Sequence, residues 1–290
     1  MLLTSAVVTG LGLGAMYGLI ALGFHVTYSV SNTVNFAQGS AVMVGAVLGF
    51  TFMVTLGWPF WMAVPVALAG CAIFGLVVER VLVRPFVERG SDAWLMATVA
   101  GGIVVDNIVL FTFGKEPRGL PSPLAQDSFD FMGTGVYPLQ LIIPIVGLSI
   151  AVVLQIVARR TAAGKAMLAV VQNKEAARLM GINAKVVIAS AFAISTVLAG
   201  VAGLLIAPLF SVHSDMGTLF GLKAFAVAIL GGIGSASGVM LAGFAYGLVE
   251  ALVTAYFGST YTQIVVFSVI ILALAAMPNG LLGRAAVNKV

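Results

Sequence analysis

Apolar residues run along this chain in long blocks, and polar residues are confined mainly to the short stretches between them. A helix of about 20 mostly apolar residues is long enough to cross the hydrocarbon core of a membrane. Nine blocks meet this criterion, at about residues 6–30, 36–57, 59–82, 92–113, 138–158, 186–210, 217–233, 237–258 and 261–282. The block at 217–233 is the shortest, and "NTVNFAQGS" interrupts the second, so either one is also compatible with a re-entrant or interrupted helix. We therefore predict an all-α, polytopic membrane protein with eight or nine transmembrane helices and one short cytoplasmic helix.

The composition supports a membrane protein and excludes a water-exposed globule. Of the 290 residues, 61% are hydrophobic and 8% are charged, and the mean hydropathy is +1.13. A soluble domain carries roughly 25% charged residues. The formal charge of +4 agrees with basic cytoplasmic loops, so no nucleic-acid partner is predicted. The first residues, "MLLTSAVVTGLGLG", contain no basic region or cleavage site and are interpreted as the start of the first span.

The basic residues favour one orientation of the spans. If all nine blocks cross, eleven of the fourteen Lys and Arg residues fall on one side, and cytoplasmic loops are the ones enriched in such residues. The eleven are Arg80, Arg84, Arg89, Arg159, Arg160, Lys165, Lys174, Arg178, Lys185, Arg284 and Lys289. We therefore place loop 159–185 and the C-terminus in the cytoplasm, and the N-terminus and loop 114–137 outside. Residues 1–290 are treated as a single transmembrane domain.

The polar stretch "VVQNKEAARLMGINAK", residues 170–185, encodes a helix of about two turns. Asn173 is suited to the N-cap, and Glu175 places negative charge in the first turn. Arg178 places positive charge near the last turn, and Gly181 suits the left-handed position after the helix. Two turns are not stable alone in water, so we predict that this helix docks onto a soluble cytoplasmic partner. The alternative is an ordinary basic connector that rests on lipid headgroups.

Two groups of polar residues fall within the apolar blocks, where polar groups are costly. The first group occupies the interruption of the second block and consists of Asn32, Asn35, Gln38 and Ser40. It is a candidate substrate path or gate, because unwound backbone at membrane depth is tolerated only where protein or a cavity surrounds it; the alternative is an interfacial turn. The second group is a candidate polar network that consists of Asp106, Asn107, Lys223 and Glu250. Lys223 is expected to pair with Asp106 or Glu250, either to lock helices together or to line a substrate path.

Three glycine-containing motifs complete the pattern. "GAMYGLI" (14–20) and "GFAYGLV" (243–249) share the spacing G-x-x-Y-G-L, and we predict that both belong to closely packed helices. "GGIGSASG" (231–238) lacks the Gly-Lys-Ser/Thr ending of a phosphate-binding loop, so it is interpreted as a tight turn between spans. His25 and His213 have no second ligand at metal spacing, so no metal site is expected.

The polar loop also resembles a known motif. Glu175, Ala176, Ala177 and Gly181 reproduce the E-A-A-x-x-x-G core of the loop by which permease subunits of bacterial ABC importers contact their ATPases. The I-x-L-P continuation of that motif is absent, because "AFAI" (191–194) stands there, which points to the branched-chain amino-acid type. From end to end, the chain resembles Liv-type permease subunits in five ordered blocks. These are "GLGLGAMYGLIALGFHVTYSVSNTVNFAQGS", "VERVLVRPF", "AVVQNKEAARLMGIN", "GLKAFAVAILGGIGSASGVMLAGFAYGLVE" and "MPNGLLG", the last with Met277 where Arg is usual.

The resemblance implies a multi-pass translocation subunit of the bacterial inner membrane that does no covalent chemistry itself. The implied partners are a second related permease, two cytoplasmic ABC ATPases, an external substrate-binding protein and the lipid membrane. No cofactor is expected in this chain, since ATP and Mg²⁺ would bind to the partner ATPases. The contacts with the ATPase are expected at Asn173, Glu175, Ala176, Ala177, Arg178, Leu179 and Gly181.

The implied substrates are leucine, isoleucine and valine, or other small amino acids. Permeases of the same type for urea or short amides remain an alternative. A stand-alone secondary transporter driven by an ion gradient, or a channel, would use the 170–185 loop as a simple connector.

Overall fold

A computed structural model describes the chain except for residues 1, 132–133, 278–279 and 284–290. Arg284, Lys289 and part of the "MPNGLLG" motif therefore lie outside the described residues. The described residues are mostly helical, as predicted. The elements in chain order are α1 (Leu2–Ser31), α2 (Gln38–Phe50), the π-helical η1 (Thr51–Thr55), α3 (Phe60–Val77), the π-helical η2 (Val78–Val83), α4 (Arg84–Val87), α5 (Trp94–Phe113), the 3-10 helix η3 (Pro123–Ala125), β1 (Phe129–Phe131), β2 (Thr134–Val136), α6 (Pro138–Arg160), α7 (Ala162–Gln172), α8 (Lys174–Leu179), α9 (Ala184–Ile206), α10 (Met216–Gly231), α11 (Ala236–Phe257) and α12 (Ser259–Ala276).

Among the described residues, eight helices are long and apolar enough to cross a membrane. The ninth predicted span, 217–233, corresponds to α10, which is apolar but has only 16 residues. Helix length therefore supports eight spans, the smaller of the two predicted numbers. Loop 114–137, which is predicted to be external, also contains two short antiparallel strands, β1 and β2, with Asp130 opposite Gly135; these strands were not predicted.

The chain divides into two compact units, each assembled from segments far apart in the sequence. The first unit comprises Met1–His25, Ser122–Ala151 and Lys223–Val290, and the second comprises Val26–Pro121 and Val152–Leu222. Three continuous helices, α1, α6 and α10, contribute residues to both units. The proposal of one transmembrane domain stays a prediction.

Close contacts between α1 and α11 hold the first unit together. A Cβ atom placed on Gly14 would lie 2.7 Å from the Cα of Phe244, and one on Gly243 would lie 2.8 Å from the carbonyl oxygen of Gly14. The two segments that share the G-x-x-Y-G-L spacing therefore pack against each other, as their small residues predict. Gly232, with a φ of +83°, begins the tight turn predicted at "GGIGSASG". His25 Nδ1 lies 2.7 Å from the carbonyl oxygen of Ile233, which places this turn beside the C-terminal part of α1.

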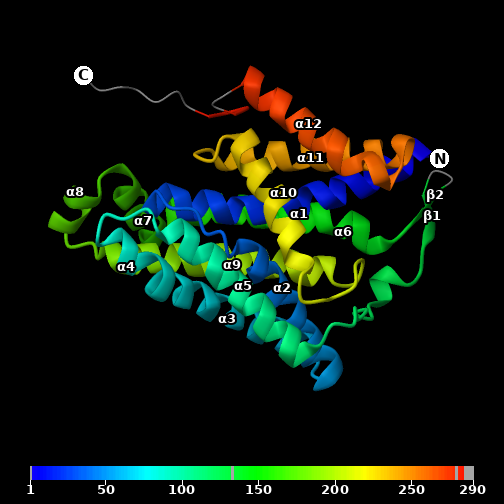
Figure 1. The fold of residues 1–290 in the computed structure, drawn as a ribbon, viewed down its shortest axis with the longest axis horizontal. Coiled ribbons are helices and arrows are strands. Elements are labelled where there is room, and N and C mark those ends of the chain that lie inside the picture. Colours follow the sequence, from blue (N-terminus) through cyan, green and yellow to red (C-terminus); the bar gives the residue numbers. More distant parts are fainter. Residues whose placement is uncertain (1, 132–133, 278–279, 284–290) are drawn as a thin grey trace. The chain divides into compact units, whose positions relative to one another are not determined.

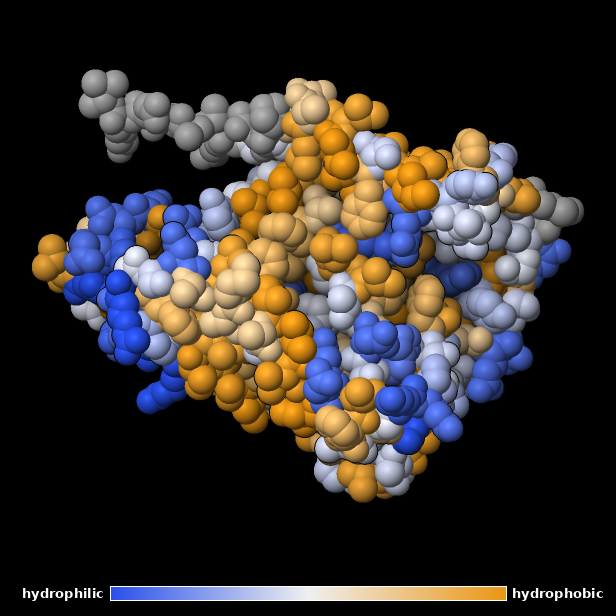
Figure 2. All heavy atoms as spheres, viewed as in Figure 1, coloured by the Kyte–Doolittle hydropathy of each residue, from blue (hydrophilic) through white to orange (hydrophobic). Residues whose placement is uncertain are grey.

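In the second unit, α9 packs against both α2 and α3, which also contact each other. The helices approach closely, because a Cβ atom on Gly45 would lie 2.5 Å from the Cα of Gly200. Large hydrophobic side chains, such as Ile73 on α3 and Ile103 on α5, are exposed on the outer faces. Figure 2 shows these faces as hydrophobic and the region of α7 and α8 as mainly hydrophilic. This distribution fits a bundle whose outer faces contact lipid and whose α7–α8 end contacts water.

Two contacts show which loops share an end of this unit. Lys185 Nζ lies 2.6 Å from Glu88 Oε1, so loop 88–93 and the start of α9 lie at one end. At the other end, Arg118 and Val212 exchange two backbone hydrogen bonds, with N···O distances of 3.0 and 2.7 Å. The basic segments that follow α3 and α6 are thus separated from residues 114–121, and which of the two ends faces the cytoplasm stays a prediction.

Candidate functional site

The short helix α8 is formed by the capping residues that the sequence predicted. The Asn173 side chain accepts hydrogen bonds from the backbone N–H groups of Glu175 and Ala176, both at 3.0 Å. Gly181 has a φ of +82°, which favours glycine after a helix end. The backbone N–H of Ile182 then donates to the carbonyl oxygen of Ala177 at 3.0 Å and closes the helix. These local bonds explain why six residues form a helix at this position.

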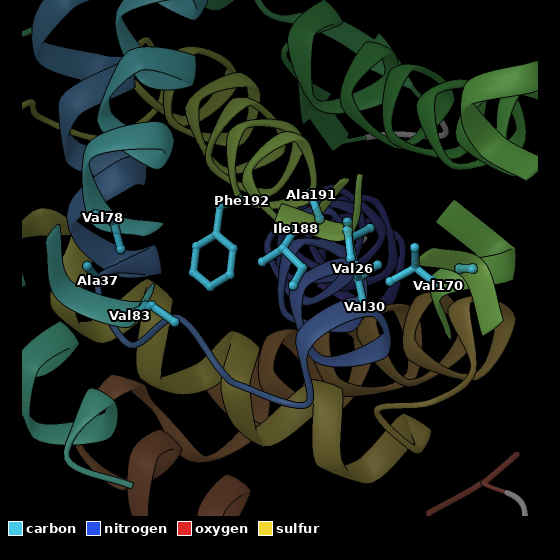
Figure 3. Close-up of a cluster of buried hydrophobic side chains, with 11 residues drawn as sticks. Val26, Val30, Ala37, Val78, Val83, Val170, Ile188, Ala191 and Phe192 are labelled. Carbon is cyan, nitrogen blue, oxygen red and sulfur yellow. The ribbon is translucent and has the colours of Figure 1, made fainter. Parts of the chain in front are cut away.

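One face of α8 is fixed to the chain, and the opposite face is free. Ala177 is 3% exposed and belongs to a buried cluster that also contains Val170 of α7 and Ile188 of α9 (Figure 3). Leu179 and Met180, by contrast, are 89% and 82% exposed. Ala177 therefore fixes α8 to the rest of the unit, whereas the sequence motif grouped it with the residues expected to contact a partner. The apolar surface exposed on this helix consists of Leu179 and Met180; the expected ATPase contacts included Leu179 but not Met180.

The charged side chains of this region form exposed ion pairs. Arg178 Nη1 lies 2.9 Å from Glu175 Oε1, one turn apart on α8. The pair between Lys185 and Glu88 joins the start of α9 to the loop after α4. The hydrogen bond and the positive charge of Lys185 lower the pKa of the Glu88 carboxyl. Exposed pairs of this kind stabilise a fold little, so the buried side chains, and not these charges, fix the position of α8.

A second helix, α7, precedes α8 and was not predicted. Thr161 caps it, because its Oγ1 atom accepts a hydrogen bond from the backbone N–H of Gly164 at 3.0 Å. The signal was present in "TAAGKAMLAVVQ", where a capping threonine precedes a run of good helix formers. The basic residues of this segment suggested a connector and concealed the helix. Segment 159–185 therefore contains two helices, α7 and α8, instead of one.

The interruption before α2 is buried within the second unit. α1 ends at Ser31, and Asn32 has a φ of +57° and is exposed. Asn35 and Gln38 are 0% exposed, and Ser40 is 5% exposed. Gln38 Nε2 donates to the carbonyl oxygen of Ser195 at 2.9 Å. Three of the four residues predicted for a path or gate are therefore enclosed by protein, and Asn32 is not.

The contact with Ser195 shows where along α9 this interruption lies. Ser195 is eleven residues after Ala184, the first residue of α9. At about 1.5 Å per residue, it lies about 16 Å along the helix from that end. The Gln38 end of the unwound segment thus lies beside the middle of α9 and is enclosed by protein, as unwound backbone at membrane depth requires. Nothing in the sequence distinguished Ser195 from other hydroxyl residues within the spans.

The polar residues Lys223 and Glu250 form an ion pair inside the first unit. Lys223 Nζ lies 2.5 Å from Glu250 Oε1 and 3.3 Å from the hydroxyl oxygen of Tyr17. The rings of Tyr17 and Tyr246 pack edge to face, with centroids 5.2 Å apart. Among the described residues, neither Glu250 Oε2 nor the Tyr246 hydroxyl has a hydrogen-bond partner. The pair therefore connects α10 to α11 and α1 in a largely apolar setting.

Asp106 and Asn107, the other two residues of the candidate network, lie on α5 in the second unit. Asn107 is exposed, and its Nδ2 atom donates to the carbonyl oxygen of Ile103 at 2.8 Å. Asp106 is partly buried. Of the two acids proposed as partners of Lys223, Glu250 is the one with which it pairs.

Comparisons with known proteins show the family to which this chain belongs. Residues 6–274 match the family described as "Branched-chain amino acid transport system / permease component". The chain is 34% identical over 294 residues to the high-affinity branched-chain amino acid transport system permease protein LivH of Salmonella typhimurium, an alignment that covers 97% of this chain and 96% of that protein. It is 34% identical over 295 residues to LivH of Escherichia coli, with the same coverage. It is 32% identical over 299 residues to the permease protein BraD of Pseudomonas aeruginosa, which covers 98% of this chain and 96% of BraD.

Proposed function

Because this chain belongs to the family of branched-chain amino acid transport system permease components, we propose that it is the membrane-spanning subunit of an ATP-driven importer in the bacterial inner membrane. Its substrates are leucine, isoleucine and valine, the class that the names of its relatives specify. The chain supplies the translocation path and no covalent chemistry. ATP and Mg²⁺ bind to two separate cytoplasmic ATPase subunits, and a second related permease and an external substrate-binding protein complete the assembly.

The free face of α8 is the observation that carries this proposal. Leu179 and Met180 are almost fully exposed at the end of the second unit that carries the basic loops. Full burial of an apolar side chain of this size contributes about 1.5–3 kcal/mol, so a protein surface that covers both gains substantially. Ala177 is buried beneath them and holds the helix against the rest of the unit. A helix that is fixed from within and apolar on its outside is suited to receive force from a soluble subunit.

The co-purification of the cognate ATPase tests this role. We expect the double variant Leu179→Ser, Met180→Ser to reduce the amount of ATPase that co-purifies at least about tenfold, because each substitution removes more than about 1.4 kcal/mol of apolar burial. Leu124→Ser is the matched control, since Leu124 is an exposed leucine (43%) on the external loop. An ATPase that binds the double variant as well as the wild type would contradict the role of α8.

The substrate and the energy source need a separate test. Proteoliposomes that contain the whole assembly should accumulate labelled leucine only when ATP and the substrate-binding protein are present. Uptake of urea or short amides in preference to leucine would assign the alternative substrate class. Full uptake by the purified chain alone, driven by an ion gradient, would assign a secondary transporter.

A further inference from the structure

The unwound segment between α1 and α2 is held to α9 by a reciprocal pair of hydrogen bonds. Gln38 Nε2 donates to the carbonyl oxygen of Ser195 at 2.9 Å, and Ser195 Oγ donates to Gln38 Oε1 at 2.9 Å. Both side chains are 0% exposed. Asn35 Nδ2 also donates to Gln38 Oε1, at 3.4 Å. The polar atoms of Gln38 therefore bond to other protein groups rather than to a cavity, and we call this connection between the unwound segment and α9 the joint.

Part of the backbone of this segment is bonded to side chains rather than to a helical ladder. The backbone N–H of Phe36 donates to Thr98 Oγ1 at 3.4 Å, and that of Ala37 donates to Asn35 Oδ1 at 3.1 Å. The backbone N–H of Gln38 donates to the carbonyl oxygen of Asn35 at 3.1 Å. Side-chain bonds can be exchanged during a movement more readily than a continuous helical ladder, which opens as a cooperative unit. The segment can therefore shift without the unfolding of a helix.

A continuous apolar cluster joins this segment to α8. Ala37, next to Gln38, belongs to the same buried cluster as Ala177 of α8 (Figure 3). Phe192 and Ile188 of α9 belong to it as well, and Figure 3 shows their side chains within it. The N-terminal half of α9 thus belongs to the cluster that contains Ala177 of α8. The middle of α9 is bonded to Gln38 through Ser195. A packed core of this kind transmits displacement, because it has little free volume to absorb it.

We propose that Gln38 and Ser195 are positioning residues that pass the movement of α8 to the unwound segment 32–37, and that this segment changes position when the ATPase subunits bind ATP. The inference rests on the proposed function, since it requires an ATPase on α8. It assigns the interruption before α2 to a moving joint rather than to a lining of the substrate path. Spatial continuity alone does not establish coupling, so variants that break the joint must be compared.

The test uses the complete assembly of permeases, ATPases and binding protein in nanodiscs or proteoliposomes. The variants are Ser195→Ala, Gln38→Met and the two combined, and the readout is labelled leucine taken up per ATP hydrolysed. We expect each single variant to lower this ratio about fivefold, while the rate of ATP hydrolysis changes less than about twofold. The double variant should be no worse than the single variants, because both remove the same joint. A merely structural role would lower uptake and hydrolysis together.

Ser190→Ala is the matched control on the same helix. Ser190 is exposed, and its Oγ atom donates to the carbonyl oxygen of Val187 at 2.8 Å. This variant should keep the wild-type ratio. Unchanged ratios for Ser195→Ala and Gln38→Met, or effects that simply add in the double variant, would overturn the proposal.

A measurement on the wild type covers the case in which the variants fail to assemble. Hydrogen exchange of the backbone amides of residues 33–38 should differ between the ATP-free complex and one trapped with ATP. Equal exchange of these amides in the two states would contradict the proposed movement of the segment. Failure of the proposed function has a different signature, because the wild-type assembly would then show no ATP-driven uptake.

Discussion

The buried ion pair between Lys223 and Glu250 allows a quantitative prediction. The side chains are 14% and 10% exposed, and Lys223 Nζ lies 2.5 Å from Glu250 Oε1. At an effective dielectric constant of about 20, two charges at this distance attract each other by about 6–7 kcal/mol. The cost of removing both ions from water offsets most of this attraction. Lys223→Met removes the attraction and leaves the carboxylate desolvated, so we expect the free energy of unfolding to fall by about 3–5 kcal/mol.

The double variant Lys223→Met, Glu250→Gln distinguishes this reasoning from a simple loss of contacts. It leaves no buried ion, and we expect it to lose only about 1–2 kcal/mol, since the Tyr17 hydroxyl loses its neighbour Lys223. The free energies of unfolding can be measured by denaturant titration in mixed micelles. Lys115→Met, which removes an exposed lysine from the external loop, is the control for the loss of a positive charge. A double variant as unstable as the sum of the single variants would refute the pairing argument.

Two further predictions concern packing and pH. A Cβ atom on Gly45 would lie 2.5 Å from the Cα of Gly200, so Gly45→Ala should lower the free energy of unfolding by about 1–3 kcal/mol. Gly12→Ala, for which the nearest contact is at 3.5 Å, should not lower it. Equal losses for the two variants would contradict the close approach of the helices at Gly45. The pKa of Glu88 is lowered from 4.5 by Lys185, so this pair stabilises the fold above pH 4.5 and less as the pH falls through the lowered pKa. Melting curves should therefore show a small loss for Glu88→Gln at pH 7 that vanishes in acid, and a loss independent of pH would contradict the pairing.

The helices whose signals lie within a few residues of sequence could be predicted well. The apolar blocks predicted the spans, and the caps at Asn173 and Gly181 predicted α8, because these signals depend on neighbours within a few residues. The hydroxyl cap at Thr161 was an equally local signal for α7. The basic residues around it were interpreted first, and the helix was missed.

Contacts between distant segments could not be predicted in the same way. Gln38 and Ser195 are 157 positions apart, and their bonds depend on how α9 packs beside the start of α2. The choice of Glu250 over Asp106 as the partner of Lys223 likewise depends on which helices are neighbours. The inward position of Ala177 follows from a cluster that gathers residues of α1, α7, α8 and α9. Helix periodicity indicates that a face is buried but does not identify what covers it.

A photo-crosslinking residue at position 180 tests the central claim most directly, in the assembled complex within membranes. The exposed side chain of Met180 should be replaced by the crosslinker without disturbing the buried side of α8, and the same residue at position 124 serves as the control. We predict an abundant product between position 180 and the cytoplasmic ATPase, and none from position 124. Crosslinks from position 180 to lipid alone would contradict the account of this chain as a permease driven through α8.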